Sequence, residues 1–248
     1  MRTLVGTLLL VSACTGPDDT ADDAFWDAST LVIASPSSGA FLPLGEPATF
    51  EAHVLDAEGV ASGFQAIEWA SSIDPGWTPI GTAFEDASLP AGVHDLTATA
   101  RLPNGDRLAT TVGGIRVQSP YAGTYAGTLA LEADITWKGT PYAASCAGGA
   151  LLTVSPEGDV LTGQAPCFLS LMGYELEAML VVDASCDQGA IEGTVSADLS
   201  FYTLDLPTSG TVTEEGDLFL DFAGGVPGFA TFEGSIEAVR VTREVEAT

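Results

Sequence analysis

Basic residues are scarce in this sequence, which has seven Lys and Arg against 34 Asp and Glu among 248 residues, a formal charge of −27. A chain so negative repels phosphate backbones, which excludes nucleic acid as a partner. There are only two histidines and no GxSxG or HExxH pattern, so no familiar catalytic or zinc motif is present. No long amphipathic helical pattern occurs either.

What the sequence does contain is 28 glycines and 14 prolines, set between short runs that alternate apolar and polar residues. Such runs bounded by turn residues are typical of antiparallel strands. The sequence therefore predicts an all-β fold. The length allows two domains, which we place at residues 30–118 and 119–248, with a seam at the segment SPYAG.

The first residues have the form of an export signal: Arg2 is followed by the apolar run 4–11 and by Ser12-Ala13 directly before Cys14. The tetrapeptide VSAC resembles the lipobox of bacterial lipoproteins. That resemblance implies removal of residues 1–13, acylation of Cys14 as with palmitate, and lipid anchoring in the cell outer membrane, with the side of that membrane left open. An ordinary cleaved signal is the alternative. The acidic segment 14–29 would then be a flexible linker.

Residues 30–118 show strands at regular spacing, with Phe50, Ala52 and Val54 on one face of the segment 48–56. The stretches SPSSGAFLPLGEPATFEAHVLD, IEWASSIDPGW and LPAGVHDLTATA resemble Ig-like and PKD-like modules of bacterial surface proteins. The resemblance implies a β-sandwich that buries Trp69 without a disulfide, and a spacer, adhesive or carbohydrate-contacting role. We expect His94 to make a structural hydrogen bond rather than act as a base.

Residues 119–248 begin with a long alternating run over 124–137. A glycine recurs inside later extended runs, in the tripeptides GTL, GTV, GTV and GSI that start at residues 127, 193, 210 and 234. Glycines within strands allow close backbone approach where strands curl. About eight strands are expected, which favours an antiparallel meander closed into a barrel, similar to lipocalins only in pattern. A second sandwich is the alternative.

Three cysteines follow Cys14, so one disulfide and one thiol are expected in an oxidising compartment. Cys146 and Cys167 flank a hairpin centred near Glu157-Gly158, so they would lie nearly opposite each other and form the disulfide. A Cys167–Cys186 bond is the alternative. No metal site or cofactor is expected.

These observations favour a non-enzymatic lipoprotein of the cell envelope that acts in surface display, adhesion or binding, with a cell-surface glycan or protein as partner. One alternative is a barrel that binds a small apolar ligand, with Tyr125, Trp137, Phe201 and Phe222 lining its interior. Another is an extracellular glycoside hydrolase that uses two of the many carboxylates.

Overall fold

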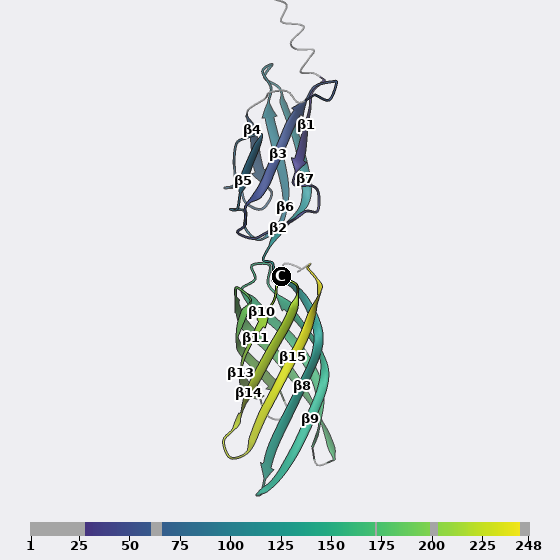
Figure 1. The fold of residues 1–248 in the computed structure, drawn as a ribbon, viewed down its shortest axis with the longest axis vertical. Helices are drawn as coiled ribbons and strands as arrows, with labels where there is room; N and C mark the ends of the chain where they lie inside the picture. The colour runs from purple at the N-terminus through teal and green to yellow at the C-terminus, as the bar shows by residue number, and fades with distance from the viewer. Residues whose placement is uncertain (1–27, 61–65, 172, 199–202, 244–248) are drawn as a thin grey trace, which may run out of the picture.

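The computed structural model describes residues 28–60, 66–171, 173–198 and 203–243. Cys14, the signal segment, most of the linker and Phe201 lie outside these residues. The described chain consists of strands and turns, as the sequence predicts, and contains no helix that could cross a bilayer. The strands form two open sheets followed by one closed barrel, stacked end to end (Figure 1).

The first unit is a sandwich of a three-stranded sheet, in the order β1-β3-β5, and a four-stranded sheet, in the order β2-β7-β6-β4. Its strands are β1 (Thr30–Ser35), β2 (Phe41–Pro43), β3 (Ala48–Leu55), β4 (Ile67–Ser71), β5 (Ala83–Asp86), β6 (Gly92–Arg101) and β7 (Arg107–Gln118). Neighbouring strands are antiparallel except β2 and β7, which are parallel.

The sandwich core is built on aromatic side chains. Phe50 on β3 is fully buried and stacks on Phe84 with ring centroids 5.1 Å apart, while Trp69 on β4 meets Phe50 edge-on at 6.0 Å. The indole of Trp69 donates a hydrogen bond to the carbonyl of Gly81 at 3.0 Å. The buried tryptophan that the sequence predicts is therefore present, and no cysteine occurs in this unit.

His94 lies inside β6 and is fully buried. Its Nε2 is 2.9 Å from the carbonyl oxygen of Pro90, and its Nδ1 is 2.7 Å from the hydroxyl of Ser71. Because a carbonyl only accepts, Nε2 carries a proton and donates to the carbonyl of Pro90. Both ring nitrogens are used in structural bonds, as predicted.

The second unit is a closed eight-stranded barrel in which each strand pairs antiparallel with its neighbours, in the order β10-β11-β12-β13-β14-β15-β8-β9. This result excludes the second sandwich. The strands are β8 (Gly123–Trp137), β9 (Thr140–Val154), β10 (Val160–Leu171), β11 (Tyr174–Asp187), β12 (Ala190–Asp198), β13 (Thr203–Val212), β14 (Asp217–Val226) and β15 (Ala230–Thr242).

Closure depends on pairing between the last and first strands of the barrel, from Ala230 opposite Ile135 to Thr242 opposite Thr124, with a register shift after Arg240. Close approach of these strands requires a glycine at position 127, because a Cβ there would lie 2.0 Å from the carbonyl oxygen of Glu237. Alternation along the strands sends one row of side chains into an apolar interior and the other row outward. Cys146 and Cys167 belong to the inward row and form the predicted disulfide, with Cα atoms 5.8 Å apart.

Specific contacts join the two units. The amide of Gln118 donates to the carbonyl of Arg243 at 2.8 Å, and the backbone N–H of Ser119 donates to the carbonyl of Pro156 at 2.8 Å. The guanidinium of Arg243 lies over the ring of Phe41, 5.0 Å from its centroid. The barrel is thus fixed to the lower end of the sandwich, while the described chain enters at the opposite end (Figure 1).

Candidate functional site: the grooved acidic face of the barrel

Two of the predicted lining residues, Tyr125 and Phe222, lie inside the barrel, where they are packed among other side chains. Tyr125 is fully buried and donates from its hydroxyl to the carbonyl oxygen of Tyr121 at 2.5 Å. Burial raises the pKa of Tyr125, and the nearby Arg240 opposes part of that rise. Phe222 is 2 % exposed and lies in the same apolar cluster. Both rings are therefore core residues.

The prediction that Trp137 lines the barrel interior is wrong, because its side chain is 49 % exposed. The last pair between β8 and β15 is Ile135 opposite Ala230, so Trp137 extends past the wall that would enclose it. Its ring instead meets Phe229 at 6.2 Å, in a T-shaped arrangement at the far end of the barrel. Phe201 lies outside the described residues.

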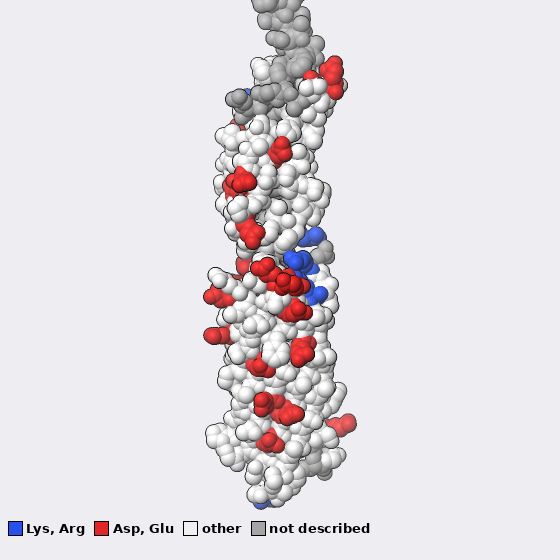
Figure 2. Space-filling model, in the orientation of Figure 1, with Lys and Arg blue, Asp and Glu red and all other residues white. Residues whose placement is uncertain are grey.

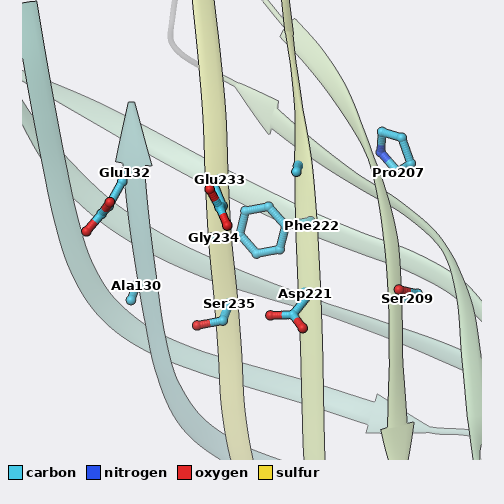
Figure 3. A pocket seen from close by; sticks show the side chains of 10 residues that line it. Ala130, Glu132, Pro207, Ser209, Asp221, Phe222, Glu233, Gly234 and Ser235 are labelled. Carbon is cyan, nitrogen blue, oxygen red and sulfur yellow. The ribbon is translucent and has the colours of Figure 1, made fainter. Parts of the chain in front are cut away.

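A hollow of about 570 Å³ lies on the outer face of the barrel. Register sets two rows of outward positions across β8, β15, β14 and β13 (Figure 3). The first row is Ala130, Ser235, Asp221 and Ser209, the second is Glu132, Glu233 and Ala223, and Pro207 also lines the hollow. Most of these side chains are short, so the floor of the hollow lies close to the backbone.

Two further hollows continue the first along the same strands. One of about 430 Å³ lies toward the sandwich and includes Thr128, Phe219 and Glu237. The other, of about 420 Å³, lies toward the far turns and includes Asp134 and Phe229. We call the three together the acidic groove, because their lining includes Glu132, Asp134, Asp217, Asp221, Glu233 and Glu237 and no Lys or Arg.

Figure 2 shows acidic side chains spread along the visible face of the barrel and several basic side chains near its junction with the sandwich. Glu132 and Glu233 are directly opposite each other in the β8–β15 ladder, and Asp221 is opposite Ser235 in the next ladder. Like charges at opposed positions disfavour folding slightly, since they repel. The opposed carboxylates of Glu132 and Glu233 therefore carry a small cost in stability.

The carboxylates of the acidic groove are open to solvent. Glu132, Glu233 and Asp221 are all exposed. Among the described residues there is also no group of three potential ligands that could hold a metal ion. What the groove can do chemically is accept hydrogen bonds from an extended polar ligand.

Sequence reasoning did not identify this groove. Alternation along 124–137 and 230–242 predicts that Glu132 and Glu233 each point outward from the barrel. Their juxtaposition, however, depends on the register between strands about 100 residues apart, and register is not written in either strand alone.

Comparison with known proteins does not assign the chain to a family, because no protein-family model and no curated protein matches it. A solved structure of the fibronectin(III)-like modules of Clostridium thermocellum CbhA is similar at 14 % identity, with a TM-score of 0.30. The alignment covers 88 % of this chain and 98 % of that one. A likeness this low carries no argument about function, which has to be inferred from the site itself.

Proposed function

We propose that this chain is a non-enzymatic binding module of a bacterial cell envelope, anchored through acylated Cys14. In this proposal the sandwich is a spacer and the barrel is the binding unit. The observation that carries the proposal is the end-to-end arrangement, in which the described chain starts at one end and the grooved barrel occupies the other (Figure 1). An anchor at residue 14 would place the acidic groove at a distance from the membrane.

The ligand that suits the acidic groove is an extended cell-surface glycan. Sugar hydroxyls donate hydrogen bonds, and the groove offers carboxylates together with the hydroxyls of Ser209 and Ser235. Exposed rings at the groove end, Phe229 and the adjacent Trp137, add apolar faces of the kind on which sugar rings pack.

The anchor is tested by mass spectrometry of the chain isolated from bacterial membranes. We expect the amino-terminal residue to be Cys14 carrying acyl chains, and we expect Cys14→Ser to release the protein from the membrane fraction. An unmodified mature start at another residue would refute the anchoring part of the proposal.

Binding is tested on a glycan array with the polypeptide from residue 15 onward, which keeps every described residue. We expect Glu132→Gln combined with Glu233→Gln to weaken binding about tenfold or more, because amides replace charged acceptors. The matched control is Glu175→Gln combined with Glu177→Gln, two exposed outward residues of β11. Equal binding by both double variants would contradict the groove as the binding site.

A further inference from the structure

The end of the barrel furthest from the sandwich carries exposed aromatic side chains. Trp137 is 49 % exposed and Phe229 is 41 % exposed. Trp137 continues the inward row of β8, which packs against the apolar interior as far as Ile135. Past Ile135 no residue of β15 pairs with β8 to cover the row. The apolar row of the interior therefore runs out into solvent at this end.

Two neighbouring turns, which join β8 to β9 and β14 to β15, bring these rings together. The backbone N–H of Thr136 donates to the carbonyl of Phe229 at 2.7 Å, and the ring of Phe229 meets that of Trp137 at 6.2 Å. The Nζ of Lys138 lies 5.8 Å from the centroid of the Trp137 ring. We call the two turns the apolar tip; it consists of Trp137, Lys138, Pro141, Tyr142, Pro227 and Phe229.

The apolar tip contains no carboxylate. The segments 135–142 and 222–232 hold Lys138 and no Asp or Glu, in a chain with a formal charge of −27. Along β8 the nearest carboxylate is that of Asp134, three residues or about 10 Å before Trp137. The apolar tip is therefore a positively charged point on a strongly negative molecule.

The other carboxylates near this end belong to strands outside the apolar tip. Glu175 is on β11 and Asp198 is on β12, and in the barrel order these strands are two steps from β9 and from β14 respectively. The β8–β9 turn reaches furthest from the sandwich (Figure 1). In Figure 2 the lowest part of the visible barrel is white apart from a basic side chain. A flat surface that approaches along the long axis thus meets the apolar tip before any carboxylate shown on that face.

The size and shape of the apolar tip favour a lipid bilayer over a protein partner. Two rings, each roughly half exposed, offer on the order of 200 Å² of apolar surface. A specific protein interface buries about 800 Å² on each partner, so the tip is too small for one. A fluid bilayer needs no complementary shape, and Trp and Tyr concentrate at membrane–water interfaces. Amphipathic helices enter that interface by about 5–10 Å, which matches the depth that is free of carboxylates along β8.

We propose that the apolar tip inserts into the interface of a lipid bilayer. Trp137 and Phe229 lie among the headgroups and upper acyl chains, and Lys138 donates to headgroup phosphates. The acidic groove stays in water, where an anionic surface repels its carboxylates, so the charge distribution favours a bilayer of zwitterionic lipid. Phe229 also borders the acidic groove, so a bilayer and a glycan compete for this ring. The insertion itself rests on neither the glycan nor the anchor at Cys14.

The first test is co-sedimentation of the polypeptide from residue 15 onward, which lacks the acylated cysteine, with phosphatidylcholine vesicles. We expect binding that increases with lipid concentration. We expect it to weaken when phosphatidylglycerol is mixed into the vesicles at low salt and to recover at high salt, because salt screens the repulsion between the negative chain and the anionic surface. A wild-type chain that does not bind phosphatidylcholine vesicles, or that binds anionic vesicles more tightly at low salt, would overturn the proposal.

Tryptophan fluorescence locates the contact on the molecule. Trp69 and Trp77 are buried in the sandwich. Trp26 lies outside the described residues and is first replaced by Phe, so that among the described residues Trp137 is the one exposed tryptophan. We expect brominated phosphatidylcholine to quench Trp137, because bromine quenches only a ring that enters the bilayer. Vesicle binding without quenching would mean that another surface holds the lipid, which would overturn the proposal.

Phe229→Ser is the decisive variant, with Phe219→Ser as its matched control. Phe219 is 40 % exposed, close to the 41 % of Phe229, but lies on β14 toward the junction. We expect Phe229→Ser to weaken vesicle binding about tenfold or more, because a ring no longer leaves water, and Phe219→Ser to leave it unchanged. Thermal unfolding of both variants checks that they are folded.

Trp137→Ser provides an independent variant should Phe229→Ser reduce the yield of folded protein, and the same loss of vesicle binding is expected. Equal binding by the tip variants and Phe219→Ser would overturn the proposal. Every readout uses vesicles and a chain without acyl groups, so the outcome is separate from the tests of the glycan and of the anchor.

Discussion

At the scale of single residues, Cys186 is the thiol that the disulfide leaves over. It is 3 % exposed, and its pKa is raised, mainly by burial, with Asp187 and Asp159 adding to the rise. A buried thiol whose anion is disfavoured reacts slowly, because the thiolate is the nucleophile. We expect a maleimide to label Cys186 only after denaturant unfolds the barrel. Rapid labelling of the native protein would contradict this.

The raised pKa values of Cys186 and Tyr125 also predict the response to alkaline pH. The folded state holds both protons to higher pH than the unfolded chain, where the ordinary values are 9.0 and 10.0. Stability is therefore fully present below about pH 9 and is lost as pH rises through the folded pKa values. We expect the midpoint temperature of thermal unfolding to decrease as the pH rises above 9, and to decrease less steeply in Cys186→Ala. An equal slope in the variant would contradict the role of the thiol.

At the scale of strands, the closing β8–β15 ladder depends on the glycine at position 127. Gly127→Ala places a Cβ against the backbone of β15 and should destabilise the barrel by about 2 kcal/mol or more. Gly149→Ala is the matched control, because a Cβ there has nothing within 4 Å. Urea unfolding of the two variants measures the difference. Equal free energies of unfolding for the two variants would mean that β8 and β15 can accommodate a Cβ at position 127 without loss of stability.

The Cys146–Cys167 disulfide joins β9 and β10 across a sequence separation of 21 residues. Cross-linking a loop of this length restricts the unfolded chain, which corresponds to about 3 kcal/mol of stability. We expect replacement of both cysteines by alanine to lower the free energy of unfolding by about 3 kcal/mol, as measured by urea unfolding. Treatment of the wild type with a reductant in denaturant should reproduce the loss.

Strand alternation is the part of this fold that the sequence reveals most directly. Local pattern was sufficient for the long strand over 124–137, the barrel and the disulfide pair, whereas the burial of Trp69 was predicted from the resemblance to Ig-like modules. It failed at Trp137, because alternation says which way a side chain points but not where the neighbouring strand ends. It also failed to reveal the acidic groove, since that groove arises from which strands become neighbours.

At the scale of the whole molecule, the junction determines whether the two units behave as one rod. Two side-chain contacts connect the barrel to the sandwich: the amide of Gln118 donates to the carbonyl of Arg243, and the guanidinium of Arg243 lies over the ring of Phe41. Small-angle scattering of the wild type should fit a single extended arrangement. Phe41→Ala combined with Gln118→Ala should broaden the distance distribution, while Arg101→Ala, an exposed change in the sandwich, should not. A broad distribution for the wild type would show that these contacts are too weak.

The even number of strands in the barrel has a consequence for how this protein can diversify. With eight antiparallel strands, β8 begins and β15 ends at the junction, so the described turns that join β8 to β9 and β14 to β15 lie at the opposite end of the barrel (Figure 1). Those turns can change in length and composition without altering the connection to the sandwich. The end of the barrel opposite the junction is therefore suited to accept longer grafted loops, and such loops would give the barrel new binding specificities.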